Sequence, residues 1–247
     1  MSGELLSLHG VHTHIGAYHI LHGVDLDVPR GECTVLLGRN GAGKTTTLRT
    51  VMGLWHASAG SVAFEGARIE AEHTADIARR GIAYVPESMA IFGDLTVREN
   101  LLLAARGARR EADIDARRLE RIFGFFPALK KFWLYPAGKL SGGQKQMLAV
   151  ARAIVEPRAL LLIDEPSKGL APAIVDNLVA ALRQLGDEDR TAVLLVEQNV
   201  AMAVALGRHV AVMDGGRIVH AGPMAALAAD EALQQRLLGL SLEATHA

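Results

Sequence analysis

The sequence lacks several features that mark whole classes of protein. It holds one cysteine, Cys33, which excludes an internal disulfide and is typical of a reducing compartment. Its 26 basic and 27 acidic residues leave a net charge of −1, so no nucleic acid is expected as a partner. No apolar run reaches the ~18 residues of a membrane span, and the first ten residues do not resemble a signal peptide. We therefore expect a protein that is soluble by itself, with Cys33 as a small buried core residue.

The residues that are present indicate an α/β fold. The 247 residues are 50% apolar, which is enough for a sizeable core, and we predict a single domain over residues 1–247. Residues 31–54 read as a strand, a glycine-rich turn and a helix. The apolar runs within residues 158–166 and 191–199 are typical of buried strands in a parallel sheet. Strands that alternate with helices in this way predict α/β architecture.

Two regions have a different pattern. The first thirty or so residues and residues 60–66 show the alternation and turns of antiparallel strands, which predicts an N-terminal antiparallel β subdomain. The charged stretch from Thr96 to Pro127 is helical in pattern, and we predict an inserted helical subdomain at roughly residues 88–156. The C-terminal segment 213–223 reads as a hairpin, and residues 224–240 as a closing helix.

The segment "GRNGAGKT" matches the phosphate-binding pattern G-x-x-x-x-G-K-[ST] in full. Its glycines let the backbone N–H groups and the start of the following helix meet phosphate oxygens. The lysine is expected to reach the terminal phosphates, and the hydroxyl of Thr45 to bind Mg²⁺. A strand before the segment and a helix after it favour this interpretation over an ordinary glycine turn. The residues predicted to hold the nucleotide here are Gly38, Asn40, Gly41, Ala42, Gly43, Lys44, Thr45 and Thr46.

A second signal is the apolar strand "LLLIDE", which ends in two carboxylates. Asp164 at the strand end is suited to the magnesium shell, and Glu165 beside it is suited to polarise a water in line with the γ-phosphate. An acidic strand end has little meaning alone. Downstream of a phosphate loop it indicates hydrolysis of a nucleoside triphosphate.

A third signal, "LSGGQ", opens the helical stretch that precedes the acidic strand. A serine and two glycines at a helix start form another anion-binding nest, which is redundant in one chain unless a second copy uses it. With this segment the sequence resembles the ATP-binding subunits of ABC transporters over nearly its whole length, because the phosphate loop, "LSGGQ", "LLLIDEP" and "VEQN" follow in that family's order. The resemblance implies a P-loop NTPase (RecA-like) core and a head-to-tail dimer with ATP between the phosphate loop of one copy and Ser141, Gly142, Gly143 and Gln144 of the other.

Three departures from the family's common pattern refine the resemblance. Glu87 in "YVPE" stands where most members have glutamine, Gln198 in "VEQN" stands where a histidine is usual, and Ala171 in "GLAP" replaces a frequent aspartate. Together the three segments resemble one of the two ATPase subunits of the branched-chain amino acid transporters, a type similar to the urea and amide systems.

The replacements at 87 and 198 raise questions of chemistry. Gln198 can donate a hydrogen bond to the γ-phosphate or to the attacking water, but it cannot carry a proton as imidazole does. We hypothesise that Gln198 senses the γ-phosphate and leaves water activation to Glu165; the alternative is a merely polar strand end. Glu87 is predicted to ligate Mg²⁺ directly or through water, together with Thr45 and Asp164, although its charge would repel phosphate unless the metal screens it.

The adenine contact and the N-terminal histidines carry weaker signals. The family's usual base-stacking aromatic is replaced by Ile15, with Tyr18 nearby, so that apolar packing by Ile15 and stacking by Tyr18 are both open. Five histidines, which lie on a predicted strand–turn–strand without a carboxylate cluster, are expected to be solvated or strand-paired rather than metal-bound. They are His9, His12, His14, His19 and His22.

The resemblance implies a Mg²⁺-dependent ATPase that drives uptake of branched-chain amino acids or related small polar solutes. Expected partners are transmembrane permease subunits, a second ATP-binding subunit (the same or a sister chain) and, indirectly, a solute-binding protein, with the chain at the cytoplasmic face of the inner membrane. A soluble ABC ATPase that acts as a mechanical clamp is the alternative. The lack of a coiled-coil insertion, a tandem ATPase domain or a basic tail counts against the clamp.

Overall fold

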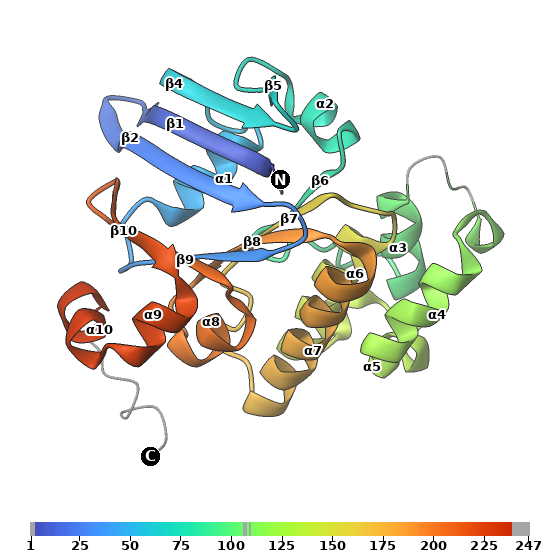
Figure 1. Cartoon of the computed structure of the whole chain (residues 1–247). Coiled ribbons are helices and arrows are strands. Elements are labelled where there is room, and N and C mark those ends of the chain that lie inside the picture. The colour runs from blue at the N-terminus through green and yellow to red at the C-terminus, as the bar shows by residue number, and fades with distance from the viewer. Residues whose placement is uncertain (1–2, 106–107, 109, 239–247) are drawn as a thin grey trace.

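A computed structural model describes residues 3–105, 108 and 110–238, and shows two β-sheets with helices packed around them (Figure 1). The smaller sheet is antiparallel and has the strand order β2-β1-β4-β5. Its alternating apolar side chains bury one face, as the N-terminal pattern predicts. The strands are β1 (Glu4–Ile15), β2 (Tyr18–Pro29), β4 (Ala57–Phe64) and β5 (Ala67–Arg68).

The larger sheet has the order β10-β9-β3-β8-β7-β6. Strand β3 pairs in parallel with both β8 and β9, and β7 pairs in parallel with β8 and β6, whereas β10 adds an antiparallel edge. The predicted parallel strands and the C-terminal hairpin are confirmed. The strands are β3 (Cys33–Leu37), β6 (Ile82–Val85), β7 (Leu160–Asp164), β8 (Ala192–Glu197), β9 (His209–Asp214) and β10 (Arg217–Pro223).

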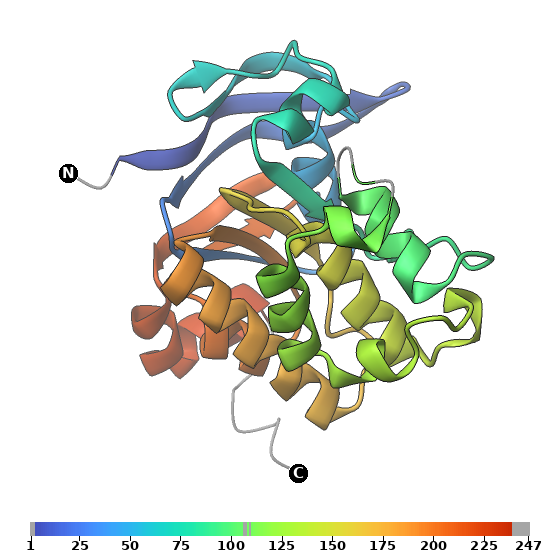
Figure 2. The same ribbon diagram turned by 90° about the vertical axis from the view of Figure 1, so that its right-hand side faces the viewer.

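Helices cover the large sheet and its β6 edge, where α3–α6 cluster (Figure 2). The α-helices are α1 (Lys44–Val51), α2 (Thr74–Arg79), α3 (Val97–Ala104), α4 (Ala116–Phe125), α5 (Pro127–Lys131), α6 (Gly142–Ile154), α7 (Pro172–Asp189), α8 (Val200–Leu206), α9 (Met224–Ala229) and α10 (Glu231–Leu238). Two 3₁₀ helices are η1 (Glu111–Asp113) and η2 (Ala137–Lys139). Among the described residues no helix is long and apolar enough to cross a membrane.

The two faces of the large sheet are buried in two different cores. Successive residues of a strand point to opposite faces, so Leu161 and Ile163 of β7 pack into the core beneath the helices, while Leu160 and Leu162 pack toward the antiparallel sheet and α1. A central sheet buried on both faces is rigid, because its inner strands are hydrogen-bonded to neighbours on both sides and most of their side chains are buried. Residues at its strand ends are therefore held in fixed positions.

The predicted helical stretch is interrupted. Helix α3 ends at Ala104, and α4 begins only after Asp115, whose carboxylate caps it by accepting from the N–H groups of Arg117 and Arg118. Residues 106, 107 and 109 of this predicted stretch lie outside the described residues.

The predicted closing helix is likewise two helices. They are separated at Asp230, whose carboxylate accepts from the N–H of Leu233 in α10. A side chain that bonds the local backbone ends one helix and starts the next. Residues 239 and 240 of the predicted helix lie outside the described residues.

We predicted that Cys33 is a buried core residue, but it is only partly buried. It starts β3 and is half-buried against the helical core. Burial still raises the pKa of its thiol to about 12, so the thiol stays protonated and unreactive at neutral pH.

Candidate functional site

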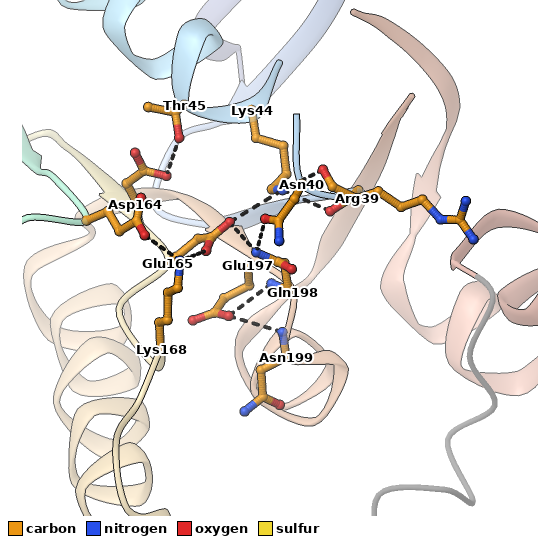
Figure 3. Close-up of polar contacts among 12 residues, drawn as sticks. Arg39, Asn40, Lys44, Thr45, Asp164, Glu165, Lys168, Glu197, Gln198 and Asn199 are labelled. Atoms are coloured by element: carbon orange, nitrogen blue, oxygen red, sulfur yellow. Dashed lines mark hydrogen bonds and ion pairs between the residues drawn. The ribbon is translucent and has the colours of Figure 1, made fainter. Parts of the chain in front are cut away.

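The order of the large sheet brings the three predicted motifs to one edge. Strand β8 lies between β3 and β7, and all three are parallel, so their carboxyl ends lie side by side. The glycine-rich loop follows β3, Asp164 ends β7, and Gln198 follows β8. Ligands of open parallel sheets bind at this edge. The strand order, and not the position in the sequence, places Gln198 between the glycine-rich loop and the acidic end of β7. Figure 3 shows the side chains that meet there.

The loop before α1 requires glycine for two different reasons. Gly38 has φ +153°, and a Cβ there would lie 2.3 Å from the carbonyl oxygen of Met213. Gly43 has φ +110° and caps α1, where a side chain would be strained in the left-handed region. Lys44 begins the helix with its side chain folded back over the loop, and its ammonium donates to the carbonyls of Gly38 (2.8 Å) and Arg39 (3.1 Å). The loop thus holds its own cation in place.

A cavity of about 340 Å³ opens over this loop. Its walls combine the loop and the start of α1 with side chains from three other segments. The lining residues are Ile20, Asn40, Gly41, Gly43, Lys44, Thr45, Thr46, Glu87, Glu165 and Lys168. Two of the predicted loop residues, Gly38 and Ala42, do not line the cavity. The side chain of Ala42 is buried in the core toward the antiparallel sheet, and its N–H donates to the carbonyl of Arg39.

Asp164 lies at the floor of the site and is almost fully buried. One of its carboxylate oxygens accepts from the hydroxyl of Thr45 at 3.1 Å, and the other accepts from the hydroxyl of Tyr84 at 3.3 Å. Burial raises the pKa of this carboxyl, and the negative charges of Glu165 and Glu87 raise it further. Tyr84 on β6 was not identified from the sequence, and burial raises its pKa to about 12, so it acts as a hydrogen-bond donor.

Glu165 has an unusual backbone conformation that aims its side chain into the cavity. Its φ is +46°, a strained value for a residue with a Cβ, and its N–H donates to the carbonyl of Val196 on β8. Its carboxylate lies 3.4 Å from the ammonium of Lys44. Strain of this kind persists only where the surroundings enforce it, and it is concentrated at functional sites.

The side chain of Gln198 is exposed and is directed toward Asn40 and Glu165 (Figure 3). Its amide nitrogen donates to Oε1 of Glu165 at 2.6 Å and to Oδ1 of Asn40 at 2.7 Å. A single side chain therefore joins the acidic strand end to the glycine-rich loop. This contact does not fit a merely polar strand end; the γ-phosphate-sensing role itself stays a prediction.

Glu87 has a partner that we did not predict. The ammonium of Lys168 lies 2.6 Å from the carboxylate of Glu87 and 3.8 Å from that of Glu165. The sequence offered one signal for it, a basic residue within "PSKGLAP", directly after the acidic strand.

Glu197 is a second residue that sequence reasoning did not identify. It is 2% exposed, and its carboxylate accepts from the backbone N–H groups of Ser167, Gln198 and Asn199 at 3.0–3.1 Å. Burial raises the pKa of this carboxyl in spite of those bonds. Glu197 ties the loop after β7 to the loop after β8, and so fixes the backbone at Gln198.

The "LSGGQ" segment starts a helix as predicted but does not line the cavity. Ser141 caps α6, and its hydroxyl accepts from the N–H of Gln144, whose side chain accepts in return from the N–H of Ser141. Ser141 and Gly142 are exposed, while Gly143 packs against Ile174. The segment thus presents a ready helix start to the outside of the chain.

The two residues considered for adenine are not part of the cavity wall. Ile15 and Tyr18 face each other across the β1–β2 turn, and Tyr18 is 76% exposed. Ile20, two residues further along β2, lines the cavity instead.

The predicted strand pairing of histidines is confirmed, because His12 lies opposite His22 and His14 opposite His19 across β1 and β2. A ring nitrogen of His12 lies 3.0 Å from one of His19, and the rings of His14 and His19 stack. Over the described ranges no group of three His, Cys, Asp or Glu residues is placed to hold a metal.

The residues present fit a Mg²⁺–nucleotide complex. Mg²⁺ prefers oxygen ligands and keeps several waters, so one or two carboxylates are sufficient beside phosphates. The hydroxyl of Thr45 and the carboxylate of Asp164 supply adjacent oxygens, while Lys44 and the N–H groups at the start of α1 supply positive charge for phosphates.

We predict that Asp164→Asn stabilises the protein without nucleotide. Because the pKa of Asp164 is raised in the folded state, its favourable contribution is present below the unfolded value of 3.8 and is lost as pH rises through the folded pKa. Asparagine carries no charge and still accepts from Thr45. We expect Tm to rise by about 2–4 °C at pH 7.5, or about 1 kcal/mol, and by less at pH 4.5, measured by thermal unfolding. The exposed Asp27→Asn should shift stability by no more than about 0.5 kcal/mol at either pH; an equal gain for both variants would contradict the prediction.

Known proteins match this chain over most of its length. Residues 21–168 match the ABC transporter family. The chain is 39% identical over 235 residues to the high-affinity branched-chain amino acid transport ATP-binding protein BraG of Pseudomonas aeruginosa, covering 95% of this chain and 100% of that protein. It is 34% identical over 222 residues to the probable branched-chain amino acid transport ATP-binding protein LivF of Archaeoglobus fulgidus, covering 90% and 93%. A solved ATP-binding subunit of an ABC transporter is similar with TM-score 0.81 and 29% identity over 97% of both chains.

Proposed function

Because the chain belongs to the ABC transporter family, we propose that it is the ATP-hydrolysing subunit of an importer for branched-chain amino acids or related small polar solutes. The observation that carries the proposal is the junction of Gln198, Glu165 and Asn40. It joins the three segments that a γ-phosphate would touch. The relatives named for branched-chain amino acid transport support the solute class.

In this proposal Glu165 polarises the attacking water, and Gln198 holds Glu165 in line and senses the γ-phosphate. The ammonium of Lys44 and the N–H groups of the loop bind the phosphates, and Thr45, Asp164 and Glu87 are the residues that would hold Mg²⁺. Bound Mg²⁺ would offset charge on the phosphates. Ile20 is the proposed apolar contact for adenine, because it lines the cavity and Ile15 and Tyr18 do not.

Two copies are needed to complete each site. The helix start at Ser141 is exposed and contributes nothing to the cavity of its own chain. A helix N-terminus with free N–H groups is an anion site, and a two-fold dimer would place it against the phosphates bound to the other copy. The other copy is proposed to be either this chain or a sister ATPase.

A second cavity, of about 330 Å³, is the proposed docking site for the permease. Strand β6, the loop after it and helices α3 and α6 form most of its walls, including Met89, Ala104 and Arg152, and Met52 at the end of α1 and Ala78 of α2 complete them. The loop that leaves β6 carries Glu87 into the nucleotide cavity and then continues through Met89 into this one. A change at the nucleotide can therefore move the permease surface through a few residues of shared backbone.

The test is purification of the tagged chain from its native membranes in mild detergent, with mass spectrometry of the proteins that come with it. Two multi-span permease chains and a second ATPase would support the importer. Soluble partners only, or none in the membrane fraction, would favour the clamp instead.

A substitution in the second cavity tests the docking site. We predict that Ala104→Arg abolishes recovery of the permease, because a long charged side chain would fill an apolar wall, while ATP affinity stays within about threefold. The matched control is Ala225→Arg, the same change at an exposed position of α9. Recovery of permease by Ala104→Arg at the control's level would place the docking surface elsewhere.

A further inference from the structure

We propose that Lys168 is a positioning residue which neutralises Glu87 in the nucleotide cavity and competes with Mg²⁺ for it. The inference rests on the proposed function of the site, and it assigns to Lys168 the control of how nucleotide and metal bind.

The contacts join two separate loops. Lys168 lies in the loop after β7, Glu87 in the loop after β6, and both line the same cavity as the phosphate-binding loop. The ammonium is 2.6 Å from Glu87 and 3.8 Å from Glu165, so it lies between the carboxylate predicted to approach the metal and the one predicted to polarise water (Figure 3 shows Lys168 directed toward Glu165). The pairing also raises the pKa of Lys168, which keeps the ammonium charged.

The pair is unsuited to a purely structural role. The Lys168 and Glu87 side chains are 59% and 47% exposed, and exposed ion pairs contribute little to folding stability. Its position matters more than its strength. The two side chains form part of the wall of the cavity that is proposed to bind the phosphates of ATP.

Charge in the cavity explains why the two residues belong together. Glu87 and Glu165 present two carboxylates to incoming phosphates, while Asp164 is buried beneath them. Lys44 is held against the loop by its carbonyl contacts. Without Lys168, the Glu87 carboxylate would repel phosphate oxygens directly. With Lys168, the charge of that carboxylate is offset by the ammonium in contact with it until Mg²⁺ replaces the ammonium as its partner.

Competition follows from the same geometry. A carboxylate that binds an ammonium at 2.6 Å must exchange that partner when it approaches Mg²⁺, directly or through a water. The lysine stem is long and mostly exposed, so the ammonium can swing away without disturbing the core. The wild-type protein should therefore bind ATP without metal better, and require more Mg²⁺, than a variant lacking the ammonium.

The experiment is a double-mutant cycle on the full chain with Lys168→Gln, Glu87→Gln and both together. ATP affinity is measured by calorimetry in EDTA, and the Mg²⁺ concentration for half-maximal tightening of ATP binding is measured by titration. We expect Lys168→Gln to weaken metal-free ATP binding roughly two- to tenfold and to lower the required Mg²⁺ by a similar factor. Glu87→Gln should strengthen metal-free binding, because it removes a negative charge from the cavity and frees the ammonium from its partner at 2.6 Å. The double variant should return to within about twofold of wild type.

Lys168→Arg is the conservative control, since it keeps the charge and should match wild type within about twofold in both measurements. Competition for Glu87 predicts that Lys168→Gln lowers the Mg²⁺ requirement only where Glu87 is present. An equal fall in the Mg²⁺ requirement in the wild-type and Glu87→Gln backgrounds would overturn the proposal, as would an unchanged Mg²⁺ requirement in Lys168→Gln. These outcomes differ from failure of the proposed function, in which no variant, nor the wild type, binds ATP or recovers a permease.

Discussion

Glu165→Gln should lower ATP turnover at least about 100-fold while ATP affinity stays within about threefold. The substitution keeps the size of the side chain and lets it adopt the same strained backbone, but an amide cannot accept a proton from water as a carboxylate can. General base catalysis contributes about 10²–10⁴-fold. Because the carboxylate lies 3.4 Å from the Lys44 ammonium, the variant also loses an ion pair, which has little effect on binding once phosphates occupy the lysine.

Turnover is measured by phosphate release from the isolated chain and from the permease complex, and affinity by calorimetry. Gln198→Ala is the comparison: it removes the bonds to Glu165 and Asn40 but leaves the carboxylate, so we expect a loss of about tenfold. Unchanged turnover in Gln198→Ala would mean that Gln198 neither positions Glu165 nor senses the γ-phosphate. Near-wild-type turnover in Glu165→Gln would mean that a group other than Glu165 polarises the attacking water.

Lys44→Ala should weaken ATP binding by on the order of 100-fold, or about 3 kcal/mol. The Lys44 side chain is 4% exposed, and the carbonyls of Gly38 and Arg39 fix the position of its ammonium before any nucleotide binds. A preorganised charge in a partly dry site stabilises phosphate more strongly than a mobile one at the surface. Removal also leaves Glu165, with its side chain 9% exposed, without its nearest cation, which adds repulsion toward the nucleotide.

The measurement is calorimetric titration of Mg–ATP into each variant, with unfolding curves recorded in parallel to show that the fold is intact. Lys131→Ala is the matched control, because it removes the same group from an exposed position on α5. Its affinity should equal that of the wild type. If Lys44→Ala bound Mg–ATP as tightly as Lys131→Ala, the cavity over the loop would not be the nucleotide site.

The motifs alone predict the chemistry of the site and the kinds of element that carry it. The glycines of "GRNGAGKT" must form a tight turn, since Gly38 has no room for a Cβ and Gly43 has φ +110°. The runs "LLLID" and "AVLLVE" must be strands of a buried sheet, because they are apolar on both faces. The family resemblance was carried by these motifs and by "LSGGQ", and the comparisons agree with it.

Breaks in helices were not predictable from periodicity. The stretch from Thr96 to Pro127 and the C-terminal stretch both kept a helical pattern through their interruptions. Each break has a local cause that the pattern does not show: Asp115 and Asp230 cap new helices with their own carboxylates.

Which side chains meet depends on how the strands assemble into the sheet. Strand order placed Gln198 between Asn40 and Glu165, although these residues are 158 and 33 positions away in the sequence. It also brought Lys168 to Glu87, 81 positions away, and put Ile20 rather than Ile15 or Tyr18 on the cavity wall. Periodicity and turn chemistry act over a few residues, so they predict single helices, strands and turns. Contacts between strand ends depend on the order in which strands pair across the whole sheet, which those local patterns do not contain.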